Sequence, residues 1–120
     1  MNYDSDFSAD AKKNKIAKRI LKEVLENPKK VTRDARCYRS GNVVVEYESK
    51  GKPSGIVTTK DSWWCFVLSG GFKDEVIIMV EMDRLKKIAE REYQRGNICV
   101  GGDSNTSKLI KIPVKDLLDN

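Results

Sequence analysis

The spacing of hydrophobic and polar positions predicts a helix near the start of the chain. Apolar residues recur at helical spacing from about residue 10 to 26, with lysines and Arg19 on the opposite side. These apolar residues are Ile16, Ala17, Ile20, Val24 and Leu25. Asn27-Pro28 ends the helix, because the residue before a proline disfavours helical backbone. We expect this helix to pack its apolar side on the core and to expose a basic side.

The next segment predicts a β-hairpin. Residues 31–38 and 43–49 both have strand-like patterns, and Ser40-Gly41-Asn42 between them favours a turn. Further along, aromatic and β-branched runs are typical of strands, and a period near 3.6 is typical of helices. The expected elements are strands at 62–68 and 75–80, a helix at 83–94, strands at 98–100 and 109–112, and a short helix near 114–118.

Length and element order predict one α/β domain. A chain of 120 residues can bury one hydrophobic core but not two. We expect a flexible N-terminus over residues 1–9 and a single domain over 10–120. Its fold class is a central mixed β-sheet flanked by helices.

The composition excludes several kinds of chemistry. The chain has no histidine, which removes serine hydrolase triads, cysteine protease dyads and histidine-ligated zinc. Cys37, Cys65 and Cys99 are far apart and odd in number, so we interpret them as reduced core or strand residues. The net charge of +5 favours a polyanionic partner. With no apolar run of membrane length and no secretory leader, we expect no membrane association and a cytoplasmic location.

The segment 43–60, VVVEYESKGKPSGIVTTK, carries the candidate chemistry. Strict strand alternation would put Val44, Glu46 and Glu48 on one face, so that two carboxylates point the same way. Neighbouring carboxylates beside a buried strand repel each other, and a divalent cation between them offsets that cost. Magnesium is the cation that we expect here, with manganese as a substitute. The alternative is a half-exposed sheet whose two glutamates simply face water.

A basic loop follows the two glutamates. Lysines neutralise phosphates, glycines let the backbone approach closely, and hydroxyl groups donate to phosphate oxygens. The candidate nucleic-acid-binding residues are Lys50, Lys52, Ser54, Thr58, Thr59, Lys12 and Arg36. The alternative is a plain connection between strands, with Lys12 on a solvated helix face.

The order of elements from about 10 to 112, with Asp34 twelve residues before Glu46, resembles the PD-(D/E)XK nuclease superfamily. The resemblance implies a restriction-endonuclease-like αβββαβ core in which Asp34 and Glu46 hold magnesium. The chain departs from the pattern at Glu48, where the family has a lysine. Glu48 then becomes a ligand or a water-orienting base, and Lys60 or Lys50 supplies the positive charge. Glu23 is the candidate for the first-helix glutamate that resolvase-like members add.

The resemblance implies a metal-dependent DNA endonuclease, with branched or phage DNA as the candidate substrate. The segment EYESKGKPSGIVTTK also resembles segments of small bacteriophage proteins, which would place this chain in the host cytoplasm. Cutting a duplex needs two sites, so a homodimer is expected. Two alternatives stay open: an inactive nuclease-like protein that only binds DNA, and a small phage protein that binds a host protein.

Overall fold

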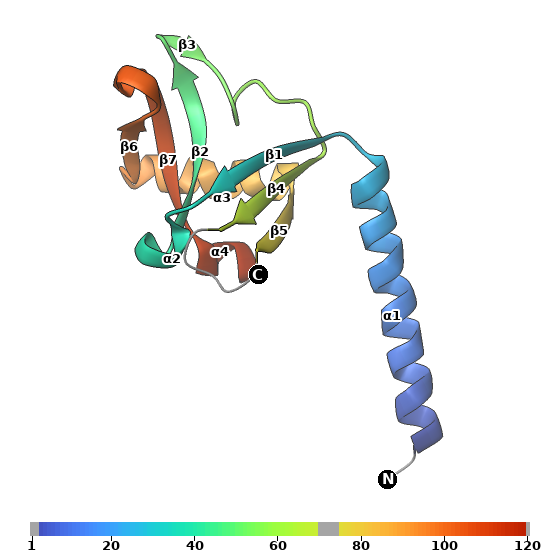
Figure 1. The fold of residues 1–120 in the computed structure, drawn as a ribbon. Coiled ribbons are helices and arrows are strands. Elements are labelled where there is room, and N and C mark those ends of the chain that lie inside the picture. The colour runs from blue at the N-terminus through green and yellow to red at the C-terminus, as the bar shows by residue number, and fades with distance from the viewer. Residues whose placement is uncertain (1–2, 70–74, 120) are drawn as a thin grey trace.

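The strands are divided between two sheets in the computed structural model, which describes residues 3–69 and 75–119 (Figure 1). The first sheet has the order β1 (Lys29–Asp34), β4 (Trp63–Leu68) and β5 (Val76–Glu81). Its central strand β4 runs parallel to β1 and antiparallel to β5, so this sheet is mixed. The aromatic and branched residues of WWCFVL suit such a central strand.

The second sheet is antiparallel. Its order is β3 (Lys52–Pro53), β2 (Asn42–Ser49), β7 (Ser107–Pro113) and β6 (Ile98–Gly101). The short helix η1 (Asp103–Asn105) lies in the connection from β6 to β7. The expected α/β class is confirmed, but the strands form two sheets in place of the expected single central sheet.

The hairpin expected from residues 31–38 and 43–49 is wrong. Strand β1 stops at Asp34, whose carboxylate accepts the backbone N–H groups of Arg36 and Cys37. These bonds turn the chain into the helix α2 (Cys37–Ser40), which ends at Gly41 with a left-handed φ of 72°. Strand β1 therefore pairs with β4, and β2 pairs with β3 and β7.

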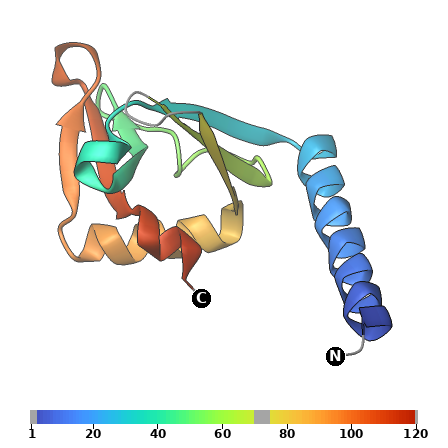
Figure 2. The ribbon, with the colours of Figure 1, turned by 60° about the horizontal axis from the view of Figure 1, so that its bottom comes forward.

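Helix α3 (Met82–Gln94) lies across the two sheets and closes the core from one side (Figure 2). The short helix α4 (Val114–Leu118) follows β7 directly and packs beside α3. The core joins residues of both sheets to α3, including Val45, Phe66, Leu85 and Ile110. Within the described residues, no helix is both long enough and apolar enough to span a membrane.

Helix α1 (Tyr3–Glu26) projects away from this body (Figures 1 and 2). It begins at Tyr3, so residues 3–9, which we expected to be loose, are helical. The prediction that α1 packs along the core is wrong, because Val24 is its only buried side chain between residues 10 and 26. The radius of gyration is 17.1 Å, whereas a compact chain of this length has about 14 Å.

Candidate functional site

Glu46 of β2 lines a cleft between the two sheets. The cleft has a volume of about 300 Å³. Its wall from the first sheet consists of Lys30, Thr32, Arg33 and Trp64, and its wall from the second sheet and the following loop consists of Val44, Glu46, Gly55 and Leu109. Alternation along β1 points Lys30 and Thr32 to this side of the first sheet and Arg33 to the other side, where the Arg33 Nε donates to Ser69 Oγ. Lys30 and the Glu46 carboxylate therefore line one space, although they belong to different sheets.

Two hydroxyl groups hold the Glu46 carboxylate in place. Ser54 Oγ donates to Oε2 over 2.9 Å, and Ser107 Oγ donates to Oε1 over 2.6 Å. Both donors are neutral hydroxyl groups, so they orient the carboxylate without neutralising its charge. An oriented carboxylate at the edge of a cleft is suited to binding a cation or accepting a proton.

The loop after β3 is fastened to the backbone of Glu46. The Ile56 N–H donates to the Glu46 carbonyl over 2.8 Å, and the Ser54 N–H donates to the Tyr47 carbonyl over 3.2 Å. Gly55 has a φ of +56° and lies so close to β2 that a side chain there would meet the Glu46 carbonyl. The loop thus fixes Ser54 against the carboxylate that it orients.

Glu48 does not share the face of Glu46. A β-bulge shifts the register of β2 against β7, so that Glu46 is opposite Leu109 but Glu48 is opposite Lys108. Leu109 faces the cleft, and its neighbour Lys108 must point to the other side of the sheet. Glu48 Oε2 lies 3.0 Å from Lys108 Nζ. The expectation of two carboxylates on one face is therefore wrong.

The electrostatic surroundings of Lys108 agree with this placement. The hydrogen bond and charge of Glu48 raise the pKa of Lys108, and the neighbouring Tyr47 and Tyr93 raise it further. These tyrosines lie on the opposite side of β2 from Glu46. Glu48 is thus engaged in an ion pair on the tyrosine side of the sheet.

Asp34 lies at the end of β1, on the same face of the strand as the cleft residues Lys30 and Thr32. Its Oδ1 accepts the N–H groups of Arg36 and Cys37, each over 2.8 Å. Burial raises the pKa of the Cys37 thiol, and the nearby charge of Asp34 raises it further. Asp34 therefore has a clear structural role as a cap at the start of α2.

Lys60 and Glu23 lie together in another cavity. This cavity of about 340 Å³ also contains Asp61, Glu81 and Lys86, and it shares no lining residue with the cleft of Glu46. The structure thus brings the candidate lysine and the first-helix glutamate together, but it does not place them beside Glu46.

The remaining predicted nucleic-acid-binding residues have separate positions. Lys12 and Arg36 are exposed, on α1 and before α2, and Lys50 and Lys52 are exposed around the tight turn from β2 to β3. Thr58 Oγ1 donates to the Gly55 carbonyl. Thr59 Oγ1 accepts the Asp61 N–H. Of this set, Ser54 is the residue whose side chain donates to the Glu46 carboxylate.

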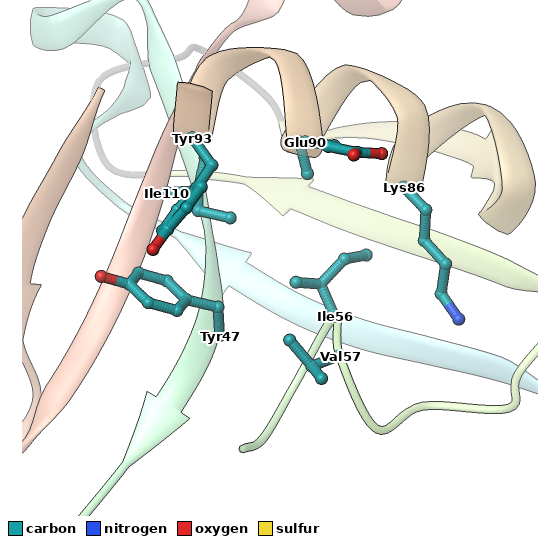
Figure 3. A pocket seen from close by; sticks show the side chains of 8 residues that line it. Tyr47, Ile56, Val57, Lys86, Glu90, Tyr93 and Ile110 are labelled. Carbon is teal, nitrogen blue, oxygen red and sulfur yellow. The ribbon is translucent and has the colours of Figure 1, made fainter. Parts of the chain in front are cut away.

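A third hollow, after the cleft of Glu46 and the cavity of Glu23 and Lys60, lies on the tyrosine side of β2 (Figure 3). It has a volume of about 440 Å³, and Tyr47 and Tyr93 meet edge to face at 5.4 Å across it. Ile56 and Ile110 give it an apolar surface, and the charges of Lys86 and Glu90 from α3 have opposite signs. This hollow lacks the surplus of positive charge that a phosphate site requires.

Three residues at the cleft, namely Lys30, Thr32 and Ser107, were not singled out from the sequence. Thr32 accepts a hydrogen bond from Trp64 Nε1 over 2.8 Å and shares its strand face with Lys30. The period-two pattern of β1 could have grouped Lys30, Thr32 and Asp34. No local signal indicates Ser107, which reaches Glu46 only because β7 pairs with β2.

No protein-family model, curated protein or solved structure matches this chain. The described residues also hold no cluster of three or more His, Cys, Asp or Glu side chains arranged as metal ligands.

Proposed function

We propose that this chain is a metal-dependent DNA endonuclease whose active site is the cleft of Glu46. The observation that carries the proposal is that an oriented carboxylate, Glu46, and the cation Lys30 line one cleft between the sheets. Phosphodiester cleavage can use this combination, because a cation holds the phosphate and a carboxylate holds a metal ion or a water. Asp34 ends the strand that carries Lys30.

The proposed cofactor is magnesium or manganese. Magnesium in such sites binds one or two carboxylates and completes its shell with water and substrate phosphate. In the proposed site Glu46, which lines the cleft, and Asp34, which ends β1 outside that lining, would provide the carboxylates, as the PD-(D/E)XK resemblance implies. When bound, the metal lowers the pKa of a bound water and neutralises charge on the phosphate. Glu48 is left out, because it is paired with Lys108 on the other face.

The protein's own residues position the substrate. Lys30 attracts a phosphate to the cleft, and its charge stabilises negative charge that develops during cleavage. Lys30 takes the place that we expected for Lys60 or Lys50. Ser54 and Ser107 keep the Glu46 carboxylate from rotating away. The exposed Lys50 and Lys52 extend the basic surface available to a DNA backbone.

Cleavage of supercoiled plasmid and of branched DNA, with magnesium or manganese, tests this proposal. Glu46→Gln, Asp34→Asn and Lys30→Ala should each reduce the cleavage rate by about a hundredfold or more, the scale of losing one electrostatic contact in a site. Glu48→Gln is the matched control, since it makes the same change on the other face and should keep the rate near that of the native chain. Equal losses in Glu46→Gln and Glu48→Gln would contradict the proposed site.

A second candidate is a nuclease-like protein that binds DNA without cutting it. The observation in its favour is that the residue at the family's lysine position, Glu48, points away from the cleft. Salt-dependent DNA binding with no cleavage under either metal would support this candidate. A chain that neither binds nor cuts DNA would instead favour the binding of a host protein.

A further inference from the structure

The hollow beside Tyr47 and Tyr93, which we call the tyrosine hollow, lies between a helix and a loop (Figure 3). Helix α3 forms one wall, and the loop after β3 forms the other. The apolar side chains that line it, Ile56, Ala89 and Ile110, are at most 5 % exposed. Its volume of about 440 Å³ is within the roughly 300–1,000 Å³ of small-molecule sites. The tyrosine hollow is therefore a preformed apolar site.

The two tyrosines give this site flat aromatic surfaces. Their rings meet edge to face, with an interplanar angle of 76°. In that arrangement each ring keeps at least one face that the other ring does not cover. Tyr93 is 48 % exposed, so a planar ligand can reach its ring. Aromatic faces of this kind are the surfaces on which unpaired nucleic-acid bases stack.

Glu90 adds a polar group that a ligand can use. Among the described residues, no hydrogen bond or ion pair engages the Glu90 carboxylate. By contrast, Lys86 Nζ donates to the Thr59 carbonyl over 3.2 Å, which ties this lysine to the loop. A carboxylate only accepts hydrogen bonds, so Glu90 favours a ligand that presents an N–H donor. The ligand that fits this hollow is therefore flat and carries an amino group.

The charges at the hollow argue against the phosphate part of a nucleotide as its occupant. Lys86 and Glu90 have opposite charges, so the lining has no net positive charge to hold a phosphate. In a duplex the bases are stacked and paired, and only an unpaired base offers its flat face and its polar edge together. The hollow thus fits the base of an unpaired nucleotide whose phosphate lies elsewhere.

The tyrosine hollow and the cleft of Glu46 lie on the two sides of one strand. Glu46 and Tyr47 are neighbours on β2, so their side chains point to opposite sides. The loop after β3 contributes to both sites, because Ser54 donates to Glu46 in the cleft and Ile56 lines the hollow. A DNA strand that passes over this loop can place a phosphate in the cleft and a nearby base in the hollow.

We propose that the tyrosine hollow receives an unpaired base of the DNA substrate, with the base stacked on a tyrosine ring and its amino group held by Glu90. This inference rests on the proposed nuclease function, and it specifies DNA with unpaired bases over a plain duplex as the substrate. Adenine, cytosine and guanine carry an exocyclic amino group, and thymine does not. The hollow should therefore favour an unpaired cytosine over an unpaired thymine.

Fluorescence anisotropy in a chelator, where no metal-dependent cleavage can occur, tests the proposal. The probes are labelled duplexes that differ only in carrying one unpaired cytosine, one unpaired thymine or no unpaired base. Tyr93→Leu should weaken binding to the unpaired-cytosine probe by about tenfold, the effect of losing one base stack, and leave binding to the plain duplex unchanged. Tyr93→Phe is the matched control, since it keeps the ring and should bind like the native chain. Circular dichroism should show the same fold for both variants.

Glu90→Gln tests the contact with the amino group. An amide both donates and accepts hydrogen bonds, so this variant should bind the cytosine and thymine probes with similar affinity, whereas the native chain prefers cytosine. Photo-cross-linking then locates the base. A 5-iodocytosine at the unpaired position should cross-link to Tyr47 or Tyr93, as mapped by mass spectrometry, and the same base in a paired position should not.

The possible results separate this inference from the nuclease proposal. DNA binding with no preference for the unpaired base, or a preference that Tyr93→Leu leaves unchanged, would overturn the role of the hollow even if the chain cuts DNA. A chain that binds none of the probes would overturn it as well. A Tyr93-dependent preference in a chain that never cuts DNA would support the hollow and contradict the nuclease activity.

Discussion

The contact of Gly55 with β2 predicts an unusually large cost for a small substitution. A Cβ atom at Gly55 would lie 2.2 Å from the Glu46 carbonyl oxygen, and the backbone there has a φ of +56°. The left-handed conformation alone costs a residue with a side chain about 1–2 kcal/mol. The clash adds to this, because a backbone atom cannot rotate out of the way. Gly55→Ala must therefore displace the loop.

Displacing the loop breaks identified contacts. The hydrogen bond from the Ile56 N–H to the Glu46 carbonyl would be lost, at about 1 kcal/mol. The Ile56 side chain, now 5 % exposed, would be partly uncovered, and full exposure of such a residue costs about 1.5–3 kcal/mol. Together with the conformational cost, Gly55→Ala should lower the free energy of unfolding by roughly 4 kcal/mol.

Gly51→Ala provides the matched control. Gly51 has a φ of +79°, but no heavy atom lies within 4 Å of a Cβ built there. It should therefore lose only the conformational part, about 1–2 kcal/mol. Urea unfolding followed by circular dichroism would measure both values, with the m-values checked for constancy. Equal losses for the two variants would refute the close packing of Gly55 on Glu46.

Three further predictions concern single side chains. Burial alone would raise the pKa of Glu92, but the hydrogen bond from Asn97 and two arginines outweigh it and hold that pKa below its usual value. Glu92→Gln should therefore cost about 2 kcal/mol near neutral pH, and urea titrations should show that difference shrinking as the pH falls through the lowered pKa; a constant difference would contradict it. Ser107→Ala should slow DNA cleavage by about 10- to 100-fold in a plasmid assay by freeing Glu46, and an unchanged rate would argue against that role. A thiol reagent should label Cys99 first, because Cys37 and Cys65 are buried. Mass spectrometry of the early product checks this, and an early product labelled at Cys37 or Cys65 would contradict it.

Local patterns predicted the positions of most helices and strands but not the pairing of the strands. The aromatic run of β4 and the helical spacing of apolar residues in α3 are each patterns within one segment. The sequence of that segment alone is therefore enough to recognise the strand or the helix. The pairing of β1 with β4 joins residues 34 positions apart, such as Lys29 and Trp63. The supposed hairpin failed because Asp34 caps a helix at a position where the pattern predicted a continuing strand.

The candidate site was predictable in part. Glu46 was identified from its strand, and the structure places it in a cleft with Lys30. Glu48 was assigned to the same face because simple alternation cannot foresee a β-bulge, which depends on the partner strand β7. Helix α1 was assigned to the core from its amphipathic pattern. That pattern shows that a helix has an apolar side to cover, but not which surface covers it.

Diffraction from crystals soaked in manganese, with anomalous scattering used to locate the ion, tests the central claim most directly. The account predicts one manganese ion per cleft, with carboxylate oxygens of Glu46 and Asp34 about 2–2.5 Å from it and Glu48 still paired with Lys108. An ion bound by Glu48, an ion in the cavity of Glu23 and Lys60, or no ion in the cleft would contradict the proposed metal site.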